Sequence, residues 1–429
     1  MNNIINIFYE ITSIPRCSKN HTPYINYMRE KAEQYGYECH IDSVNNILCK
    51  KANSKANLCL QSHYDIVCLE DGKVPEIIQE DGILKAKNST LGADNGMGCA
   101  IILALMSEGK DCEYLFTSDE EIGLIGTNDI EFTLDAKYML NLDSEAEGEV
   151  CIGCAGGVDI FAANQTKQII ANDENYTLYE CEIKELDGGH SGVDIDKEIP
   201  NAIKLMAKTI KEADAKILDI NGGERINSIP KYCKAIIASK EMPKASHENM
   251  NILKIDTESK HLNIYSDDIL NFLYTFANGV RGYDINLGVV LDSINLAQIE
   301  TTHEDIKVSL SARSMQNDRL ESIKNETTTL LHSFGFKTTT DGKYPAWKPD
   351  VNEFTNGVLK IYKKHNEKAS LEAIHAGLEC AIFKDKFPHI KIASIGPNIY
   401  NPHSFKERCE IKSVENIYKI VLDIVKEYE

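Results

Sequence analysis

The stretch Tyr114-Leu115-Phe116-Thr117-Ser118-Asp119-Glu120-Glu121-Ile122-Gly123 joins a short apolar run to a cluster of acids. Its first three residues are typical of a buried strand, and two adjacent glutamates follow where that strand ends. A carboxylate is costly to bury unless it is paired or binds a metal ion. One carboxylate that binds a metal beside one that carries a proton is what metal-assisted hydrolysis requires. The alternative is a solvated loop, which describes most isolated Glu-Glu pairs.

Around this stretch, predicted strands alternate with a predicted helix. A strand over 58–60 leads to His63, and another over 138–142 ends at Asp143. Between them lies an apolar helix over 97–106. Strands that alternate with helices predict an α/β fold with a mostly parallel sheet. In open sheets of this kind, sites form at the carboxyl ends of the strands.

Several residues at these strand ends, and one near the end of the chain, are candidate metal ligands. The candidates are His63, Asp94, Glu121, Asp143 and His403. Neighbouring candidates lie 22 to 260 residues apart, which excludes a zinc finger. Two Zn²⁺ ions, three carboxylates and a bridging hydroxide sum to zero charge, so this set suits a partly buried cleft. Nitrogen and oxygen ligands fit zinc, and also manganese or cobalt. For Asp94 the structural alternative is to cap the helix that follows.

Two further acids have expected roles beside the ligands. Because Glu120 and Glu121 are consecutive, they project in different directions, and one can bind metal while the other faces a bridging water. As general base, Glu120 would take a proton from that water and pass it to the leaving amine. Asp65 shares a strand face with His63, so it can accept the spare imidazole N–H and fix the tautomer. Taken alone, His-x-Asp is a weak signal.

Composition restricts the class of protein. The chain has 429 residues, which suggests about two to three domains. Its formal charge of −20 disfavours nucleic acid and anionic membranes as partners. The chain contains neither an apolar run near the roughly 18 residues of a membrane helix nor a signal peptide, so we expect a cytoplasmic location. The 13 scattered cysteines are then expected to be reduced thiols, and the Cys-x-x-Cys at Cys151 is a weak metal or redox signal.

The middle of the chain differs in texture from its two ends. Over 158–344, amphipathic strands and polar helices occur without acidic strand ends, which predicts an inserted α+β lid domain. The last segment returns to the first texture, with a strand over 391–395 before the loop that carries His403. We therefore expect a discontinuous catalytic domain over 1–157 and 345–429, interrupted by the lid.

Eight motifs, in order along nearly the whole chain, resemble the M20 metallopeptidases and, within them, the aminoacyl-histidine dipeptidase branch. The motifs are QSHYDIV (61–67), STLGADNG (89–96), LFTSDEEIG (115–123), LNLDSE (140–145), GCAGG (153–157), GGHSG (188–192), HAGLEC (375–380) and SIGP (394–397) leading to His403.

This resemblance implies a phosphorylase/hydrolase-like α/β domain that holds two zinc ions per subunit, with Mn²⁺ or Co²⁺ as alternatives. It implies that His63 and Asp143 hold one metal, that Glu121 and His403 hold the other, that Asp94 bridges them, that Asp65 orients His63, and that Glu120 is the general base.

Two lid residues also match the family pattern. His190 resembles a histidine that, in dimeric members, helps to bind the substrate carbonyl or developing oxyanion; the alternative is a polar residue in a glycine-rich turn. Arg313 resembles the arginine that grips the C-terminal carboxylate of the substrate, a task that suits its bidentate geometry. The alternative for Arg313 is an exposed surface position. The resemblance also implies a homodimer through the lid, with a short peptide as the substrate.

Departures from the family pattern leave the substrate preference open. They are Ser62 in place of glycine, the bulky Tyr64, the run over 194–200, and Cys151 where an aromatic residue is common. The expected activity is hydrolysis of dipeptides, of Xaa-His type by resemblance. One alternative is another M20 hydrolase, either a tripeptide aminopeptidase or an N-acyl-amino-acid deacylase. The other is a non-catalytic peptide-binding member. The role of Asp119 stays open.

Overall fold

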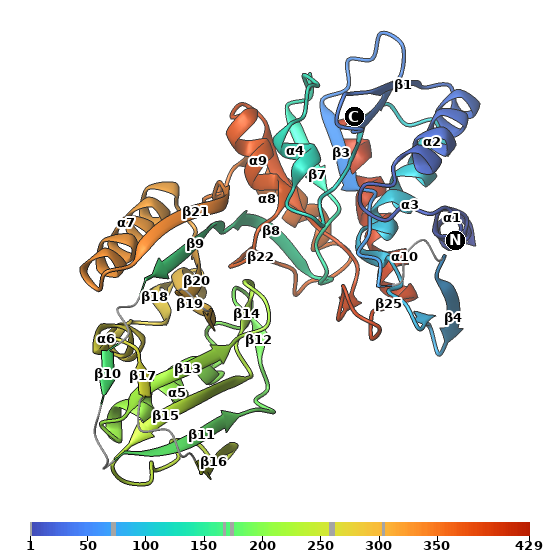
Figure 1. Cartoon of the computed structure of the whole chain (residues 1–429). Helices are drawn as coiled ribbons and strands as arrows, with labels where there is room; N and C mark the ends of the chain where they lie inside the picture. Colours follow the sequence, from blue (N-terminus) through green and yellow to red (C-terminus); the bar gives the residue numbers. More distant parts are fainter. Residues whose placement is uncertain (1, 70–73, 166–168, 172–175, 257–261, 303–304) are drawn as a thin grey trace. The chain divides into compact units, whose positions relative to one another are not determined.

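The chain packs as two compact units, each with a hydrophobic core of its own (Figure 1). The computed structural model describes residues 2–69, 74–165, 169–171, 176–256, 262–302 and 305–429. Unit 1 comprises Met1–Cys154, Trp347–Ala373 and Leu378–Glu429, and unit 2 comprises Ala155–Ala346 and Ile374–Gly377. The lid expected over 158–344 does not include the four residues Ile374–Gly377, which pack with unit 2.

Unit 1 combines helices with a large sheet and a smaller one. Its elements are α1 (Asn2–Thr12), α2 (Thr22–Tyr35), β1 (Glu38–Ile41), β2 (Ile47–Lys50), β3 (Leu58–His63), β4 (Glu76–Glu80), β5 (Ile83–Lys87), α3 (Ala93–Ser107), β6 (Glu113–Thr117), α4 (Ile125–Asn128), β7 (Tyr138–Asn141), β8 (Glu149–Cys154), α8 (Glu353–Tyr362), β22 (Ser370–Ile374), α9 (Glu379–Lys386), β23 (Lys391–Ser394), β24 (Ile399–Tyr400), β25 (Arg408–Glu410) and α10 (Ile411–Tyr428).

The large sheet of unit 1 is parallel at its centre and antiparallel toward its edges. Among the described residues, its strand order is β1-β2-β6-β3-β7-β23-β8-β22. The central strands β6, β3, β7 and β23 pair in parallel. By contrast, β1 and β2 form an antiparallel hairpin, β2 pairs antiparallel with β6, and β8 pairs antiparallel with β23. The expected α/β fold is therefore confirmed, with the parallel pairing confined to the centre of a mixed sheet.

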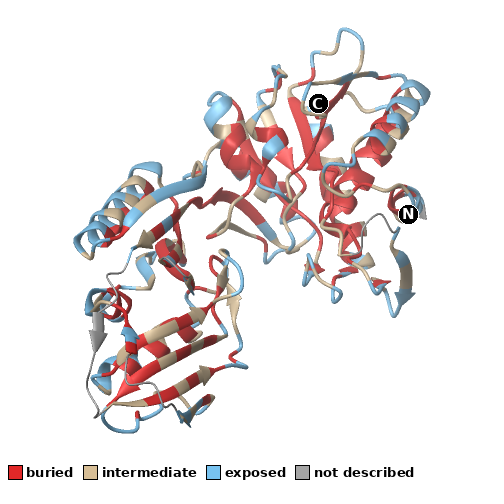
Figure 2. Ribbon diagram, viewed as in Figure 1, coloured by how far each residue is buried: buried red, intermediate tan, exposed pale blue. Residues whose placement is uncertain are grey.

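The core of unit 1 lies around these central strands. Strands β3 and β6 are buried at every position, as parallel strands covered on both faces are. Helix α3 is apolar all round and packs against α1 and β3, so it is almost wholly buried. The buried colouring of the central strands and of α3 in Figure 2 follows this arrangement.

Unit 2 is an α+β unit built on antiparallel strands. Its elements are β9 (Gly156–Asn164), β10 (Ile169–Ala171), β11 (Thr177–Ile183), β12 (Gly189–His190), α5 (Ala202–Glu212), β13 (Lys216–Gly222), β14 (Ser228–Ile229), β15 (Cys233–Ser239), β16 (Met250–Ile255), β17 (Leu262–Ile264), α6 (Asp267–Thr275), β18 (Gly279–Asp284), β19 (Val289–Thr301), β20 (Ile306–Ser314), α7 (Asn317–Ser333) and β21 (Lys337–Tyr344). In the described residues, the large sheet has the order β16-β11-β15-β13-β19-β20-β9-β21, with β18 also beside β19.

Local sequence explains how helix α5 of unit 2 begins. The Asn201 side chain accepts hydrogen bonds from the backbone N–H groups of Ile203 (3.0 Å) and Lys204 (3.2 Å), which caps α5. Apolar residues on one face of α5 then pack into the core of the unit. The inserted α+β character expected from the sequence is confirmed.

One expectation about the cysteines is wrong. Cys17 and Cys68 form a disulfide, with Cα atoms 5.6 Å apart, although 51 positions separate them in sequence. Cys17 pairs with Ile66 in an isolated β-bridge, which brings the two thiols together in a way that spacing alone does not indicate. The structure places no further disulfide among the residues it describes.

Among the helices in the described part of the chain, none is both long enough and apolar enough to cross a bilayer.

Candidate active site

Three of the expected ligands lie at or after the ends of adjacent parallel strands of unit 1. The other two lie in a turn and in a loop. His63 ends β3, Glu121 follows β6, and Asp143 follows β7. Because β6, β3 and β7 are neighbours that run in the same direction, their carboxyl ends meet at one edge of the sheet. Asp94 lies in the turn that opens α3, and His403 lies on the loop between β24 and β25.

Asp94 stands between the two histidines. Its Oδ1 lies 3.1 Å from His63 Nε2, and its Oδ2 lies 2.9 Å from His403 Nε2. Asp143 Oδ1 is 3.2 Å from the same nitrogen of His63. Glu121 Oε2 is 2.9 Å from the same nitrogen of His403. The five expected ligands thus converge as two groups that share Asp94.

Asp94 does not act as a helix cap. Gly92 occupies the N-cap position of α3, and Asp94 lies inside the first turn with non-helical backbone angles. Both carboxylate oxygens contact histidines instead. The structural alternative considered for this residue is therefore not the one that the chain adopts.

Electrostatics in this cluster is dominated by crowded carboxylates. Burial, followed by the charge of Asp94, raises the pKa of Glu121 to about 7. Burial opposes protonation of His403, but Asp94 and Glu121 raise the pKa of its imidazole to about 11. Burial also opposes protonation of His63, but Asp143, Asp65 and Asp94 raise the pKa of this imidazole well above its usual value. The cluster holds more acids than its two imidazoles can balance.

The residues present fit bound divalent cations. Single ligand atoms of His63, Asp94 and Glu121 lie within 4.8 Å of one another, close enough to share an ion. Glu121 Oε1 is buried and has no hydrogen-bond partner in the described part of the chain. A buried carboxylate oxygen without a donor is costly, and a cation would both satisfy it and relieve the repulsion between the acids. Carboxylate and imidazole donors without thiolate leave zinc, manganese and cobalt as suitable metals.

Asp65 is fully buried and links two parts of the site. Its carboxylate lies 3.6 Å from His63 Nδ1, which is closer to the backbone carbonyl of Asp65 (3.1 Å). The same carboxylate accepts hydrogen bonds from the backbone N–H of Glu120 (3.0 Å), the backbone N–H of Glu121 (3.3 Å) and the Ser18 hydroxyl (2.7 Å). Asp65 therefore fixes the turn that carries both glutamates, a role that the sequence did not indicate.

Glu120 lies in an acidic setting, beside Glu121. Burial raises the pKa of Glu120 well above its usual value. The charge of His63 opposes this shift, and the charges of Glu121 and Asp143 add to it. A carboxylate that holds a proton more readily than usual is suited to accept a proton and return it.

The structure gives Asp119 a role. Its Oδ1 accepts a hydrogen bond from the Lys19 backbone N–H (2.7 Å), and its Oδ2 lies 3.1 Å from His21 Nε2. Asp119 thus fastens the segment before α2 to the end of β6, directly beside Glu120. Since both contacts involve residues about 100 positions away, sequence spacing carried no sign of them.

Glu379 is a further buried acid that sequence reasoning did not assign. Its carboxylate accepts hydrogen bonds from Gln61 Nε2 (2.6 Å), from the Thr117 hydroxyl (2.8 Å) and from the Thr127 hydroxyl. Burial raises its pKa to about 7, against the opposing charge of His63. The motif HAGLEC was the available signal, but it carried no role for this residue.

Unit 2 gathers the two expected lid residues around Gly192. A Cβ atom at Gly192 would lie 3.1 Å from His190 Cε1 and 3.2 Å from Arg313 Nε, so both side chains border this glycine. Arg313 is only 6% exposed, which rules out the alternative of an exposed surface arginine. It donates a hydrogen bond to the Tyr344 hydroxyl (2.7 Å), while its Nε has no hydrogen-bond partner in the described residues.

Two imidazoles of unit 2, those of His190 and His375, are held by hydrogen bonds. His190 Nδ1 accepts hydrogen bonds from the backbone N–H groups of Gly192 (3.2 Å) and Val193 (3.1 Å), so its proton resides on Nε2. His375 lies 2.7 Å from the Ser293 hydroxyl through Nε2. Burial, aided by the charge of Arg313, lowers the pKa of His375 to about 3.

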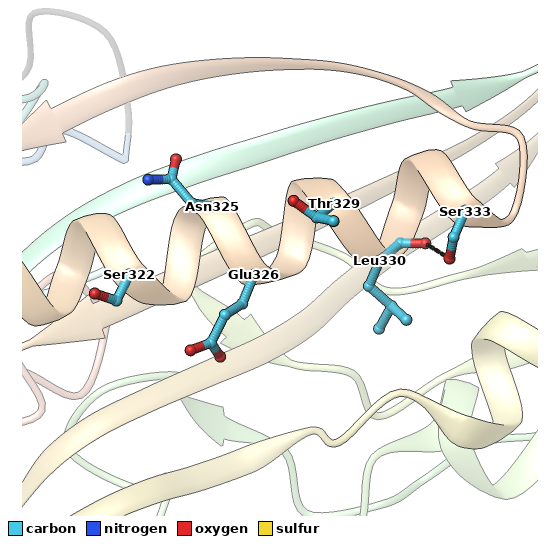
Figure 3. A pocket seen from close by; sticks show the side chains of 6 residues that line it. All are labelled: Ser322, Asn325, Glu326, Thr329, Leu330 and Ser333. Atoms are coloured by element: carbon cyan, nitrogen blue, oxygen red, sulfur yellow. Dashed lines mark hydrogen bonds between the residues drawn. The ribbon is translucent and has the colours of Figure 1, made fainter.

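A hollow on the surface of unit 2 follows helix α7 (Figure 3). Its lining residues are Ser322, Asn325, Glu326, Thr329, Leu330 and Ser333. They come from one helix, and Glu326 is the one ionisable side chain among them. This hollow therefore offers no catalytic or metal-binding cluster.

The chain is similar to known proteins in sequence and in structure. No family model matches it. The cytosol non-specific dipeptidase of Escherichia coli (strain K12) is 31% identical over an alignment of 472 positions. This alignment covers 98% of this chain and 96% of that protein. The crystal structure of aminoacylhistidine dipeptidase from Vibrio alginolyticus has a TM-score of 0.82 at 27% identity, covering 100% of this chain and 96% of that one. An M20 family metallo-carboxypeptidase from Sulfolobus solfataricus, at 14% identity, shares the fold with a TM-score of 0.58 over 100% and 99% of the two chains.

These likenesses extend over both units. The relative at 31% identity and the structure with the TM-score of 0.82 are both dipeptidases, so the alternative activities are not favoured. The family resemblance drawn from the eight motifs is confirmed. The chain belongs to the M20 family of metallopeptidases, among its dipeptidases.

Proposed function

We propose that this chain hydrolyses dipeptides with two divalent metal ions, held by His63 and Asp143 on one side, by Glu121 and His403 on the other, and by Asp94 between them. The observation that carries the proposal is the position of Asp94, whose two carboxylate oxygens each contact a different histidine. A carboxylate shared in this way can serve two ions at once. Zinc is the proposed metal, with manganese or cobalt as alternatives.

Bound divalent metal ions would supply Lewis-acid polarisation of the scissile carbonyl and would make a water molecule more acidic. As the proposed general base, Glu120 would take a proton from the attacking water and deliver it to the leaving amine as the peptide C–N bond breaks. The backbone N–H groups of Glu120 and Glu121 donate to Asp65, which keeps the two glutamates aimed in different directions. Glu121 is then free to bind metal while Glu120 carries the proton.

Arg313 is proposed to bind the C-terminal carboxylate of the substrate. Its buried guanidinium has an unpartnered Nε among the described residues, and a carboxylate can accept from two of its N–H groups in parallel. His190 is proposed to donate its Nε2–H to the substrate carbonyl oxygen, since its Nδ1 already accepts two backbone hydrogen bonds. In this proposal the catalytic domain spans 1–157 and 345–429, and 158–344 forms the substrate-binding lid.

Three further features belong to the proposal. We extend it to Xaa-His dipeptides as substrates, following the aminoacylhistidine dipeptidase of Vibrio alginolyticus, although the Escherichia coli relative is described as non-specific. A cytoplasmic location is supported by the description of that relative as a cytosol enzyme. A homodimer through the lid rests on the family resemblance.

A matched substrate panel combined with metal analysis tests the proposal. Ala-His, Ala-Leu, Ala-Ala-His and N-acetyl-histidine are offered to the purified protein before and after chelation and after return of Zn²⁺, Mn²⁺ or Co²⁺. We expect both dipeptides to be cleaved, Ala-His faster, with two ions per chain and complete loss of activity on chelation. Turnover of the tripeptide or the N-acetyl compound alone, or full activity without metal, would overturn the proposal.

A further inference from the structure

The turn that carries Asp94 is not held by the helix that follows it. Helix α3 is assigned from Ala93, yet Asp94 has φ −81° and ψ 109°, outside the helical range. Gly92, just before, has a φ of 69°, a left-handed conformation that favours glycine. The first N–H groups of a helix have no acceptor within it, so the position of this turn depends on contacts from elsewhere in the chain.

Glu407 supplies acceptors for these N–H groups. Its Oε2 accepts hydrogen bonds from the backbone N–H of Leu91 (2.7 Å) and Gly92 (3.0 Å). Its Oε1 accepts from the N–H of Ala93 (2.8 Å) and Asp94 (3.3 Å). One carboxylate, 2% exposed, therefore binds four consecutive amides of the turn. Such bonds to a charged acceptor are among the stronger hydrogen bonds in proteins.

Glu407 also belongs to the loop that carries His403. The two residues are four positions apart, and the Glu407 N–H donates to the Ser404 carbonyl (3.1 Å). His403 Nε2 in turn lies 2.9 Å from Asp94 Oδ2. The His403 loop thus meets the Asp94 turn twice, once through the histidine and once through the glutamate.

Arg16 makes the equivalent link to the other histidine. Its Nη2 donates to the Gly92 carbonyl (2.7 Å), and its Nη1 donates to the carbonyl of Tyr64 (2.9 Å), the residue after His63. Arg16 is 1% exposed. One buried cation therefore joins the Asp94 turn to the end of β3, while one buried carboxylate joins the same turn to the His403 loop.

We propose that Arg16 and Glu407 are positioning residues that hold Asp94 between His63 and His403, so that its two oxygens serve two metal ions. Neither side chain contacts the ligand atoms, and each acts through the backbone of the turn. This inference rests on the bridging role proposed for Asp94. It predicts that removing either contact weakens metal binding without removing a ligand.

If Arg16 and Glu407 only stabilised the fold, their variants would lose stability but keep their affinity for metal. Glu113 provides a matched control for this possibility. Glu113 is also 2% exposed, and its carboxylate accepts hydrogen bonds from the backbone N–H of Asp135 (3.2 Å) and Ala136 (3.1 Å). It lies at the start of β6, at the opposite end of that strand from Glu120. Glu113→Gln therefore reports the cost of disturbing a buried carboxylate that binds amides in the same unit.

The experiment compares Glu407→Gln, Glu407→Asp and Arg16→Lys with Glu113→Gln and Asp94→Asn in the full chain. Co²⁺ binding to the metal-free proteins is measured by calorimetry and by visible absorption, and their folding by circular dichroism and thermal unfolding. We expect Glu407→Gln and Arg16→Lys to bind at least one Co²⁺ about 10- to 100-fold more weakly, with an altered spectrum. Glu407→Asp, which keeps the carboxylate, should recover part of the affinity.

Other outcomes separate the possible failures. Glu113→Gln should melt at a lower temperature yet bind Co²⁺ with wild-type affinity and spectrum. If Glu407→Gln and Arg16→Lys behave in that same way while Asp94→Asn loses metal, the positioning role is wrong and the proposed metal site stands. If Asp94→Asn itself binds two Co²⁺ with an unchanged spectrum, the bridging role fails and the inference fails with it. If Glu407→Gln does not fold, Arg16→Lys decides.

Discussion

The two units assemble their polar residues on different kinds of sheet. In unit 1, β6, β3 and β7 run in parallel, so the residues after them meet at one edge whatever their separation in sequence. In unit 2, the described pairings of the large sheet are antiparallel, and consecutive strand ends point to opposite edges. Arg313 lies within β20, and His190 lies on the short strand β12. Residues that follow parallel strands therefore indicate a shared site from the sequence alone. Residues on the antiparallel strands of unit 2 give no such indication.

The charges of the two units differ as well. The strand ends of unit 1 bring together buried acids that could hold a metal ion. The residues around Gly192 in unit 2 bring together a buried guanidinium and imidazoles, one of them held neutral. This difference predicts that changes in unit 1 affect turnover or metal content, while changes in unit 2 affect substrate binding.

The largest effect is expected for Glu120→Gln in unit 1. Glutamine keeps the shape of the side chain but cannot accept and return a proton, so kcat should fall by about 10²- to 10⁴-fold. The two metal ions should stay bound because the proposed ligands are intact. Steady-state kinetics and metal analysis of the same preparation measure both.

Glu131→Gln is the control for this change, since that carboxylate is exposed and contacts Ser43. It should leave kcat unchanged. Loss of metal from Glu120→Gln would make Glu120 a ligand, and an unchanged kcat would remove it from the mechanism.

The next largest effect is expected on stability, from removal of the disulfide bond of unit 1. The disulfide between Cys17 and Cys68 closes a loop of 51 residues, and removing such a link typically costs about 2–4 kcal/mol of unfolding free energy. Cys17→Ser should therefore lower the urea midpoint of unit 1. The fluorescence of the single tryptophan, Trp347, follows this unit.

A dithiol reductant should shift the wild-type protein to the same midpoint and leave Cys17→Ser unaffected. The control is Cys39→Ser, a partly exposed cysteine of unit 1 outside the disulfide. Equal midpoints for oxidised wild type and Cys17→Ser would show that the link contributes nothing.

Much of unit 1 could be predicted from the sequence because its chemistry follows its strands. His63, Glu121 and Asp143 each follow the end of a short apolar run by one to five residues, and that pattern is visible without a structure. The antiparallel edges were not expected, since short strands such as β1 and β2 have no pattern that distinguishes their direction.

The contacts that position the ligands were beyond sequence analysis. Glu407 and Arg16 act on backbone amides and carbonyls, which every residue has, so no residue type or spacing marks their partners. Asp119 contacts Lys19 and His21 across about 100 positions for the same reason. Cys17 and Cys68 are 51 positions apart, and the contact between their segments is an isolated bridge from Cys17 to Ile66, which no sequence pattern marks.

In unit 2, Arg313→Lys should have a smaller effect, and on substrate binding rather than turnover. Lysine keeps the charge but loses the planar fork, and hydrogen bonds to charged groups contribute about 1.5–3 kcal/mol. KM for Ala-His should rise about 10- to 100-fold with kcat largely retained. Arg281→Lys, at an exposed ion pair with Glu326, should leave both constants unchanged. A fall in kcat without a change in KM would place Arg313 in the chemical step.

The smallest effect is expected from the pH dependence of unit 2, through His375. This imidazole is 5% exposed, and its pKa of about 3 in the folded chain compares with about 6.5 in an unfolded one. Between these values the unfolded state binds more protons, so stability is complete above pH 6.5 and falls as the pH is lowered toward 3. At pH 5 the loss is about 2 kcal/mol, at about 1.4 kcal/mol for each pH unit.

His375→Gln removes this titration, so its unfolding free energy should fall less between pH 7.5 and pH 5 than that of the wild type. Urea unfolding followed by circular dichroism reports both units, whereas Trp347 fluorescence reports unit 1. The difference between variant and wild type should therefore appear in the first signal and be absent from the second. His332→Gln, on the exposed side of α7, should keep the wild-type pH dependence. Parallel pH curves for wild type and His375→Gln would contradict a neutral, buried His375.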